Sequence, residues 1–148
     1  MEKMIVYKGV AVYKDKLYSC KTFNSTSKGL LEQNLPLPGN VLEYEIDKET
    51  KPQFGCIFAF ETLDAALYFR RLFCIGGEKV PDVEYAIIQG VGKESKRQYY
   101  SIVSCIMNSI LMKKFWKGTR KRKNELSLPD RTVFLKSFKF KSFMVTKD

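Results

Sequence analysis

The chain of 148 residues contains 26 Lys and Arg against 16 Asp and Glu, for a formal net charge of +10, and 45% of its residues are hydrophobic. This length is typical of one domain that buries a core without disulfides or metals, so we expect a single domain over residues 1–148. The chain has no histidine, which excludes Ser-His-Asp and Cys-His catalysis and imidazole-ligated metal sites.

The charge is divided unevenly along the chain. Residues 1–90 hold 11 Lys and Arg against 12 Asp and Glu, a net charge of −1, whereas residues 91–148 hold 15 against 4, a net charge of +11. Such asymmetry indicates a polyanionic partner. The four cysteines form no C-x-x-C pair and no apolar run is long enough to span a membrane. We therefore expect a cytoplasmic protein in a reducing compartment, with no metal and no membrane span.

The first part of the chain predicts strands joined by polar turns. Residues 4–13, "MIVYKGVAVY", alternate apolar and polar side chains and predict a strand. Residues 16–23 predict a second strand, and the short Lys14-Asp15 connection between the two suits a hairpin turn. Residues 24–40 are rich in Asn, Ser, Gly and Pro, so we expect them to be mostly loop.

The middle of the chain predicts two further strands and the clearest helix. A strand is expected over residues 41–46, and the apolar run 56–60, "CIFAF", is typical of a buried central strand. Residues 61–77 predict a helix with Thr62 as its N-cap and Gly76-Gly77 at its end. Its apolar face consists of Leu63, Ala66, Phe69 and Phe73.

The last part of the chain predicts two strands and a second helix. Residues 83–91 predict a strand, and residues 98–116 place apolar side chains at helical spacing, although their β-branched content leaves a strand open. A long strand is expected over residues 131–145, with Lys139 and Lys141 on the face opposite Phe138 and Phe140. Its apolar face is expected to contain Phe134, Phe138, Phe140 and Met144. The pattern predicts an α+β fold with a mostly antiparallel sheet of about five to six strands and two helices.

The strongest functional signal is the basic loop, "KKFWKGTRKRK", at residues 113–123. It holds seven cationic side chains, no anionic one and the only Trp of the chain. Clustered cations bind phosphates by releasing counterions, and an aromatic ring can stack on a base. A solvated surface loop would have the same composition, and so would a segment lying on an anionic membrane. The candidate anion-binding residues are Lys113, Lys114, Trp116, Lys117, Arg120, Lys121, Arg122 and Lys123. Supporting contacts are expected from Lys93, Lys96, Arg97, Lys136, Lys139 and Lys141.

A second glycine-containing stretch, "QGVGKES" at residues 89–95, is only a weak match to a phosphate-binding loop. The full pattern requires a glycine and a Ser or Thr where this chain has Ile87 and Glu94. A turn after a strand is sufficient to explain Gly90 and Gly92.

The order of three short motifs resembles that of the ADP-ribosyltransferases. Tyr7-Lys8-Gly9, "FNSTS" at residues 23–27 and Glu43-Tyr44-Glu45 correspond to the arginine, Ser-Thr-Ser and Glu-x-Glu motifs of that family. The resemblance implies NAD as cofactor, gripped at Lys8 and supported at its nicotinamide pocket by Ser25 and Ser27. It implies a Glu-x-Glu pair of Glu43 and Glu45, with Glu45 stabilising the cationic transition state. The chain departs from the family in having Lys8 for the arginine and a short connection from Ser27 to Glu43.

A second resemblance covers more of the chain. The succession "KLYSCK", "EYEIDKETKPQFGCIFAF", "LDAALYFRRLF", "FWKG" and "LPDRTVFLKSFKF" is similar to a group of small, mostly uncharacterised phage and archaeal-virus proteins. The residues that fit their recurring turn and strand-helix unit are Thr50, Pro52, Gly55, Phe58 and Phe60. The resemblance implies a small viral accessory protein that acts against host defence by binding a macromolecule or a nucleotide signal.

Together these observations predict a non-catalytic intracellular protein without a cofactor. It would bind nucleic acid or another phosphate-bearing partner through its basic C-terminal half. Two alternatives stay open: an inhibitor that binds a host defence protein, and an ADP-ribosyltransferase-like enzyme that uses NAD.

Overall fold

The structure is a computed structural model that describes residues 3–20, 23–39, 41–52, 55–71, 80–96, 101–103, 125–127 and 131–145. These residues form two helices and nine strands. In chain order they are β1 (Lys3–Tyr13), β2 (Lys16–Ser19), α1 (Ser25–Glu32), β3 (Glu43–Tyr44), β4 (Glu49–Thr50), β5 (Ile57–Phe60), α2 (Leu63–Phe69), β6 (Glu84–Glu94), β7 (Ser101–Val103), β8 (Glu125–Ser127) and β9 (Thr132–Val145).

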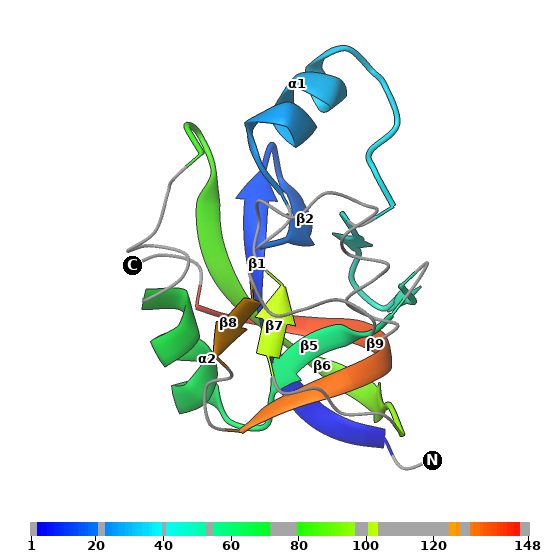
Figure 1. Cartoon of the computed structure of the whole chain (residues 1–148), viewed down its shortest axis with the longest axis vertical. Coiled ribbons are helices and arrows are strands. Elements are labelled where there is room, and N and C mark those ends of the chain that lie inside the picture. The colour runs from blue at the N-terminus through cyan, green and yellow to red at the C-terminus, as the bar shows by residue number, and fades with distance from the viewer. Residues whose placement is uncertain are drawn as a thin grey trace.

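Seven of the strands form one antiparallel sheet whose pairing closes on itself (Figure 1). β1 pairs with β6, β6 with β9, and β9 with β5, while Tyr7 opposite Phe60 joins β5 back to β1. β2 and β3 extend the sheet from β1, and β4 adds to β9. The predicted α+β class with a mostly antiparallel sheet is confirmed. The sheet has seven strands rather than five to six because β4, a two-residue strand in the predicted polar connection, pairs with β9.

The hairpin of β1 and β2 forms as its sequence predicts. Tyr13 lies opposite Lys16, and the two residues between them, Lys14 and Asp15, have φ values of 48° and 65°. Two consecutive residues in the left-handed region give a turn that matches the twist of the flanking strands.

The sheet buries side chains on both of its sides. Alternate residues of the strands fill the interior of the closed sheet, and a second core lies between the outer side and α2. All four residues of β5 are buried because Ile57 and Ala59 face the interior while Phe58 and Phe60 face α2. The prediction of a buried central strand is therefore confirmed.

Helix α2 begins after Thr62 as predicted, and it covers part of the outer side of the sheet. The Ala65 amide donates to the Thr62 hydroxyl at 3.2 Å, which caps the helix. Ala66 and Phe69 are fully buried, and the Phe69 ring lies 5.1 Å from that of Phe60. In the described part of the chain, no helix is long and apolar enough to cross a membrane.

Strand β9 is interrupted by three bulges against β6. The extra residues are Lys136, Lys141 and Met144, and all three are exposed. A bulge reverses the side on which the following side chains lie. Phe134 therefore packs beneath α2, whereas Phe138 and Phe140 lie in the interior. The prediction that these rings share one face with Met144 is wrong, but the separation of Lys139 and Lys141 from Phe138 and Phe140 is confirmed.

Two helix and loop predictions also fail. Residues 25–32 form α1 inside the predicted loop, because Asn24 and Ser27 make a reciprocal capping box at its start. Residues 101–103 form β7, paired with β8, where a helix was the first expectation. The rest of that predicted helix lies outside the described residues, as do Phe73 and Gly76-Gly77.

The two glycines after Ile88 lie within a strand rather than in a turn. β6 continues to Glu94, and Gly90 and Gly92 face the interior. A Cβ atom added at Gly90 would lie 2.3 Å from the Lys139 carbonyl oxygen, and one at Gly92 would lie 2.6 Å from a Leu135 methyl carbon. Both glycines thus allow β9 to pack closely over β6, and the turn explanation is wrong.

Candidate anion-binding surface

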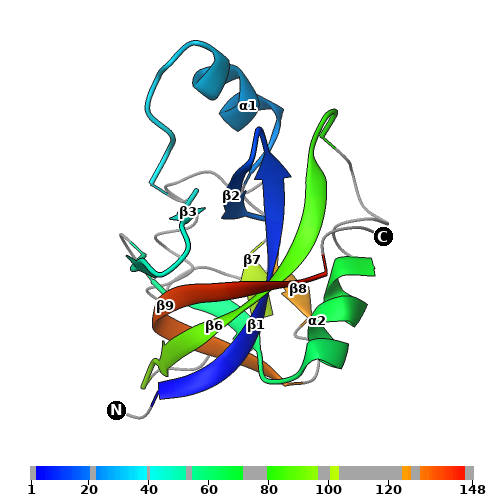
Figure 2. The ribbon, with the colours of Figure 1, turned by 180° about the vertical axis from the view of Figure 1, so that it is seen from behind.

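Helix α2 packs on β1 and β5 and covers the outer side of β1 along only part of its length. Figure 2 shows β1 and β6 side by side, with α2 beside them. At Gly9 an added Cβ would lie 3.6 Å from the Phe69 ring of α2. Toward the start of β1 the residues on the same side become accessible, because Tyr7 is partly exposed and Ile5 and Lys3 are exposed. The open part of the sheet therefore begins at Tyr7.

Lysines occupy this open part on all three strands. Lys3 lies directly opposite Lys93 on β6, and Lys93 lies opposite Ser137, next to the bulge residue Lys136. Opposite residues of an antiparallel pair point to the same side of the sheet. One further step along, Lys139 lies opposite Val91.

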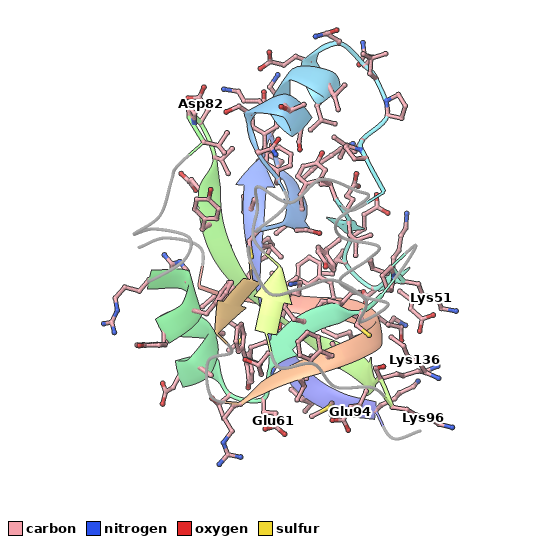
Figure 3. The ribbon with its side chains drawn as sticks, in the orientation of Figure 1. Lys51, Glu61, Asp82, Glu94, Lys96 and Lys136 are labelled. Atoms are coloured by element: carbon pink, nitrogen blue, oxygen red, sulfur yellow. The ribbon has the colours of Figure 1, made fainter. Side chains whose placement is uncertain are left out.

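Lys96 lies two residues after the end of β6. Figure 3 shows Lys96 and Lys136 on the same side of the molecule, with Glu94 and Lys51. We refer to the five residues Lys3, Lys93, Lys96, Lys136 and Lys139 as the lysine face.

Among the described residues, the lysines of the lysine face make no ion pair with a carboxylate, a property they share with Lys14 and Lys16 on the β1–β2 hairpin. Ion pairs of 2.7 to 3.8 Å occupy Lys28, Lys48, Lys51, Arg131 and Lys141. Within the part of the chain that the structure describes, no lysine of the lysine face has a carboxylate oxygen within 4.0 Å. Like charges directly opposite one another destabilise a sheet. An arrangement that opposes stability in this way is typical of a functional surface.

Most of the predicted supporting lysines come together here. Lys93, Lys96, Lys136 and Lys139 all belong to the lysine face. Lys141 does not, because its ammonium pairs with Asp47 at 2.7 Å and so lowers the pKa of that carboxyl. The basic loop at residues 113–123 and Arg97 lie outside the described residues.

The sequence interpretation missed Lys3. The expected first strand began at residue 4, whereas β1 begins at Lys3. Lys3 lies two residues before Ile5 and four before Tyr7, so a strand that began one residue earlier places all three on one side.

Lys8, the residue compared with the family arginine, is not at the surface. It lies between Val6 and Val10 on β1 and is 2% exposed. Its ammonium donates to the Phe58 carbonyl oxygen at 2.8 Å and lies 4.0 Å from the centroid of the Phe58 ring. The side chain is thus held in the core instead of being presented to a dinucleotide.

The two serines compared with the Ser-Thr-Ser motif of the ADP-ribosyltransferases lie at the start of α1. Ser25 is the exposed first residue of α1. Ser27 is buried, and its hydroxyl oxygen accepts a hydrogen bond from the backbone N–H of Asn24 at 3.3 Å. The Ser27 hydroxyl therefore has a structural role in the capping box.

The two glutamates do lie together, at the edge strand β3. Tyr44 between them is buried in the interior core, and the Glu45 carboxylate is close enough to Glu43 to influence its pKa. Burial raises the pKa of the Glu43 carboxyl above its ordinary value. The hydrogen bond from Lys48, at 2.7 Å, lowers the pKa of Glu45. Glu43 and Glu45 thus lie near each other, whereas Lys8 is in the core and Ser25 and Ser27 belong to α1.

These placements leave the lysine face as the described surface with the clearest chemical character. Comparison of the chain with protein-family models, with curated protein sequences and with solved structures found no match.

Proposed function

We propose that the chain is a non-catalytic protein that binds nucleic acid or another phosphate-bearing polyanion. The lysine face carries this proposal, because five lysines with no carboxylate oxygen of the described residues within 4.0 Å lie on or next to three adjacent strands. The net charge of +11 over residues 91–148 supports it, since four of the five lysines belong to that part of the chain. The proposed setting, a small viral accessory protein, rests on the sequence resemblance alone.

The expected binding mode is electrostatic. Each lysine that neutralises a phosphate releases condensed counterions, so affinity falls steeply as salt is added. An ammonium is a point charge that contacts phosphate oxygens without reading base identity. We therefore expect binding of many sequences with similar affinity, and further affinity from the basic loop at residues 113–123.

The first prediction concerns three lysines of the lysine face. We expect a variant that combines Lys93→Gln, Lys136→Gln and Lys139→Gln to bind labelled oligonucleotides, of DNA and of RNA, more weakly than the original chain. The slope of log K against log salt should become less steep by about 2, since each phosphate contact to a single strand contributes about 0.7. Fluorescence anisotropy over a series of salt concentrations measures both quantities.

The matched control changes the same number of charges elsewhere. Lys14→Asn, Lys16→Gln and Lys28→Gln lie on the β1–β2 hairpin and α1, away from the start of β1 (Figure 1). Asn at residue 14 tolerates the left-handed backbone of that turn. An equal loss of affinity in both variants would show that net charge alone attracts the ligand. No binding of any polyanion by the original chain would refute the proposal. A stable protein complex that survives nuclease would then favour the host-protein inhibitor.

A further inference from the structure

The lysine face encloses a set of side chains that are not charged. The register of β1, β6 and β9 arranges the outward side chains in rows that cross the three strands. Lys3 and Lys93 belong to the first row, and Lys139 lies in the second row between Val91 of β6 and Glu49 of β4. Between and beyond these cations the outward residues are Ile5, Val91, Tyr7, Gln89 and Ser142.

The apolar members of this set are accessible to a ligand. Ile5 is 61% exposed, and its neighbours Val91 and Tyr7 are partly exposed. A large apolar side chain in the middle of a cationic sheet face makes no favourable contact with a phosphate, because phosphates bind cations and hydrogen-bond donors. Its position suits a ligand that carries anionic and apolar groups side by side.

The third row holds the aromatic side chain in place. The Gln89 amide donates to the Tyr7 hydroxyl oxygen at 3.3 Å, and the Ser142 hydroxyl donates to the Gln89 amide oxygen at 3.3 Å. This chain of hydrogen bonds crosses all three strands. It places a partly exposed ring beside Ile5, about two strand residues or 7 Å further along β1.

A single-stranded nucleic acid has the matching chemistry. In a duplex the bases are stacked inside and the phosphates lie outermost, so the outer side of the sheet would contact mainly phosphates. A single strand can place its phosphates on lysines while its unstacked bases lie on apolar or aromatic side chains, in a way that tolerates any sequence. Three strands about 4.8 Å apart give a surface about 10 Å wide for such contacts.

Building on the proposed function, we propose that the lysine face binds single-stranded nucleic acid in preference to duplex. Lys3, Lys93 and Lys139 contact the phosphates. The bases lie over Ile5, Val91 and Tyr7.

The test compares three polyanions on a variant with a less apolar face. The variant combines Ile5→Thr with Val91→Thr, because threonine keeps the β-branched shape that strands favour. The control is Ile46→Thr, since Ile46 is 57% exposed on the connection between β3 and β4. The probes are a labelled single strand, as DNA and as RNA, its duplex, and inorganic polyphosphate, which has the charge and no bases.

We expect the original chain to bind the single strand about tenfold more tightly than the duplex at equal salt. The double variant should lose about three- to tenfold in affinity for the single strand, with an unchanged salt slope and unchanged polyphosphate affinity. The Ile46→Thr control should bind as the original chain does. Equal affinity for all three polyanions, tighter binding of the duplex, or an unaltered double variant would overturn this inference while leaving the proposed function intact. Absence of binding to every probe would remove both.

Discussion

At the scale of single residues, two glycines illustrate how a local pattern is misread without its tertiary partners. From sequence, Gly90 and Gly92 resemble turn or phosphate-loop residues, because glycine is common in both. In the structure, the backbone and side chains of β9 occupy the space beside each of their Cα atoms, so a larger residue would not fit. No feature within residues 89–95 could reveal this contact, because Phe138 and Leu135 are more than forty positions away in the chain.

We predict that Gly90→Ala destabilises the fold. The added methyl group would meet the Lys139 carbonyl oxygen at 2.3 Å and the Phe138 ring at 2.5 Å, and a paired backbone cannot easily move aside. We expect a loss of about 1–3 kcal/mol in the free energy of unfolding, as for other overpacked cores. Urea unfolding followed by circular dichroism measures this loss.

Gly29→Ala provides the control for this prediction. Gly29 lies in α1 with nothing within 4 Å of an added Cβ. Alanine is favoured over glycine in a helix by about 0.5–1 kcal/mol, so this substitution should be neutral or stabilising. If Gly90→Ala proved as harmless as Gly29→Ala, the close packing of β9 over β6 would be wrong.

At the scale of elements, the sequence is most informative where one strand or helix determines its own pattern. Three features could be predicted because each depends on neighbours within a few residues. They are the alternation in β1, the apolar run of β5 and the capped start of α2. The bulges of β9 could not be predicted from the sequence, because a residue is extra only relative to the pairing register with β6. Strict alternation therefore placed Phe134 on the side of Phe138, although the bulge at Lys136 separates them.

We predict that β9 tolerates substitution of Lys136 but not its deletion. Lys136→Ala keeps the extra residue and should leave the free energy of unfolding almost unchanged, because the side chain is exposed. Deletion of Lys136 removes the bulge and would turn Phe138 and Phe140 outward, while both are at most 2% exposed now. Losing a buried Phe costs about 3–5 kcal/mol, so two such losses approach the whole stability of an ordinary domain.

Near-ultraviolet circular dichroism and the dispersion of amide NMR signals distinguish the two outcomes. The substituted chain should give the spectrum of the original chain, and the shortened chain should give that of an unfolded or loosely packed state. A deletion variant that folds with the original stability would show that the register of β9 does not depend on the bulge.

At the scale of the whole molecule, closure of the sheet brings together residues that are far apart in the chain. Lys3, Lys93 and Lys139 come from the two ends and the middle, and only the pairing of β1, β6 and β9 makes them neighbours. Four of the five lysines of the lysine face come from the basic part of the chain, residues 91–148. The charge asymmetry of the sequence could not include Lys3, because composition carries no information on which strands pair.

The clustering of like charges on the lysine face predicts that added salt has opposite effects on stability and on binding. The Debye length falls from about 30 Å at 0.01 M salt to about 10 Å at 0.1 M, so added salt screens the repulsion among these lysines and should raise the melting temperature. It should also weaken oligonucleotide binding, because each counterion released from the nucleic acid gains less entropy at the higher salt concentration. The Lys93→Gln, Lys136→Gln and Lys139→Gln variant should melt a few degrees higher than the original chain at low salt and respond less to added salt. Calorimetry of both chains at the two salt concentrations, alongside the hairpin and α1 control, measures the difference. A lower melting temperature of the variant at low salt would mean that these lysines support the fold, and the trade of stability for anion binding would be refuted.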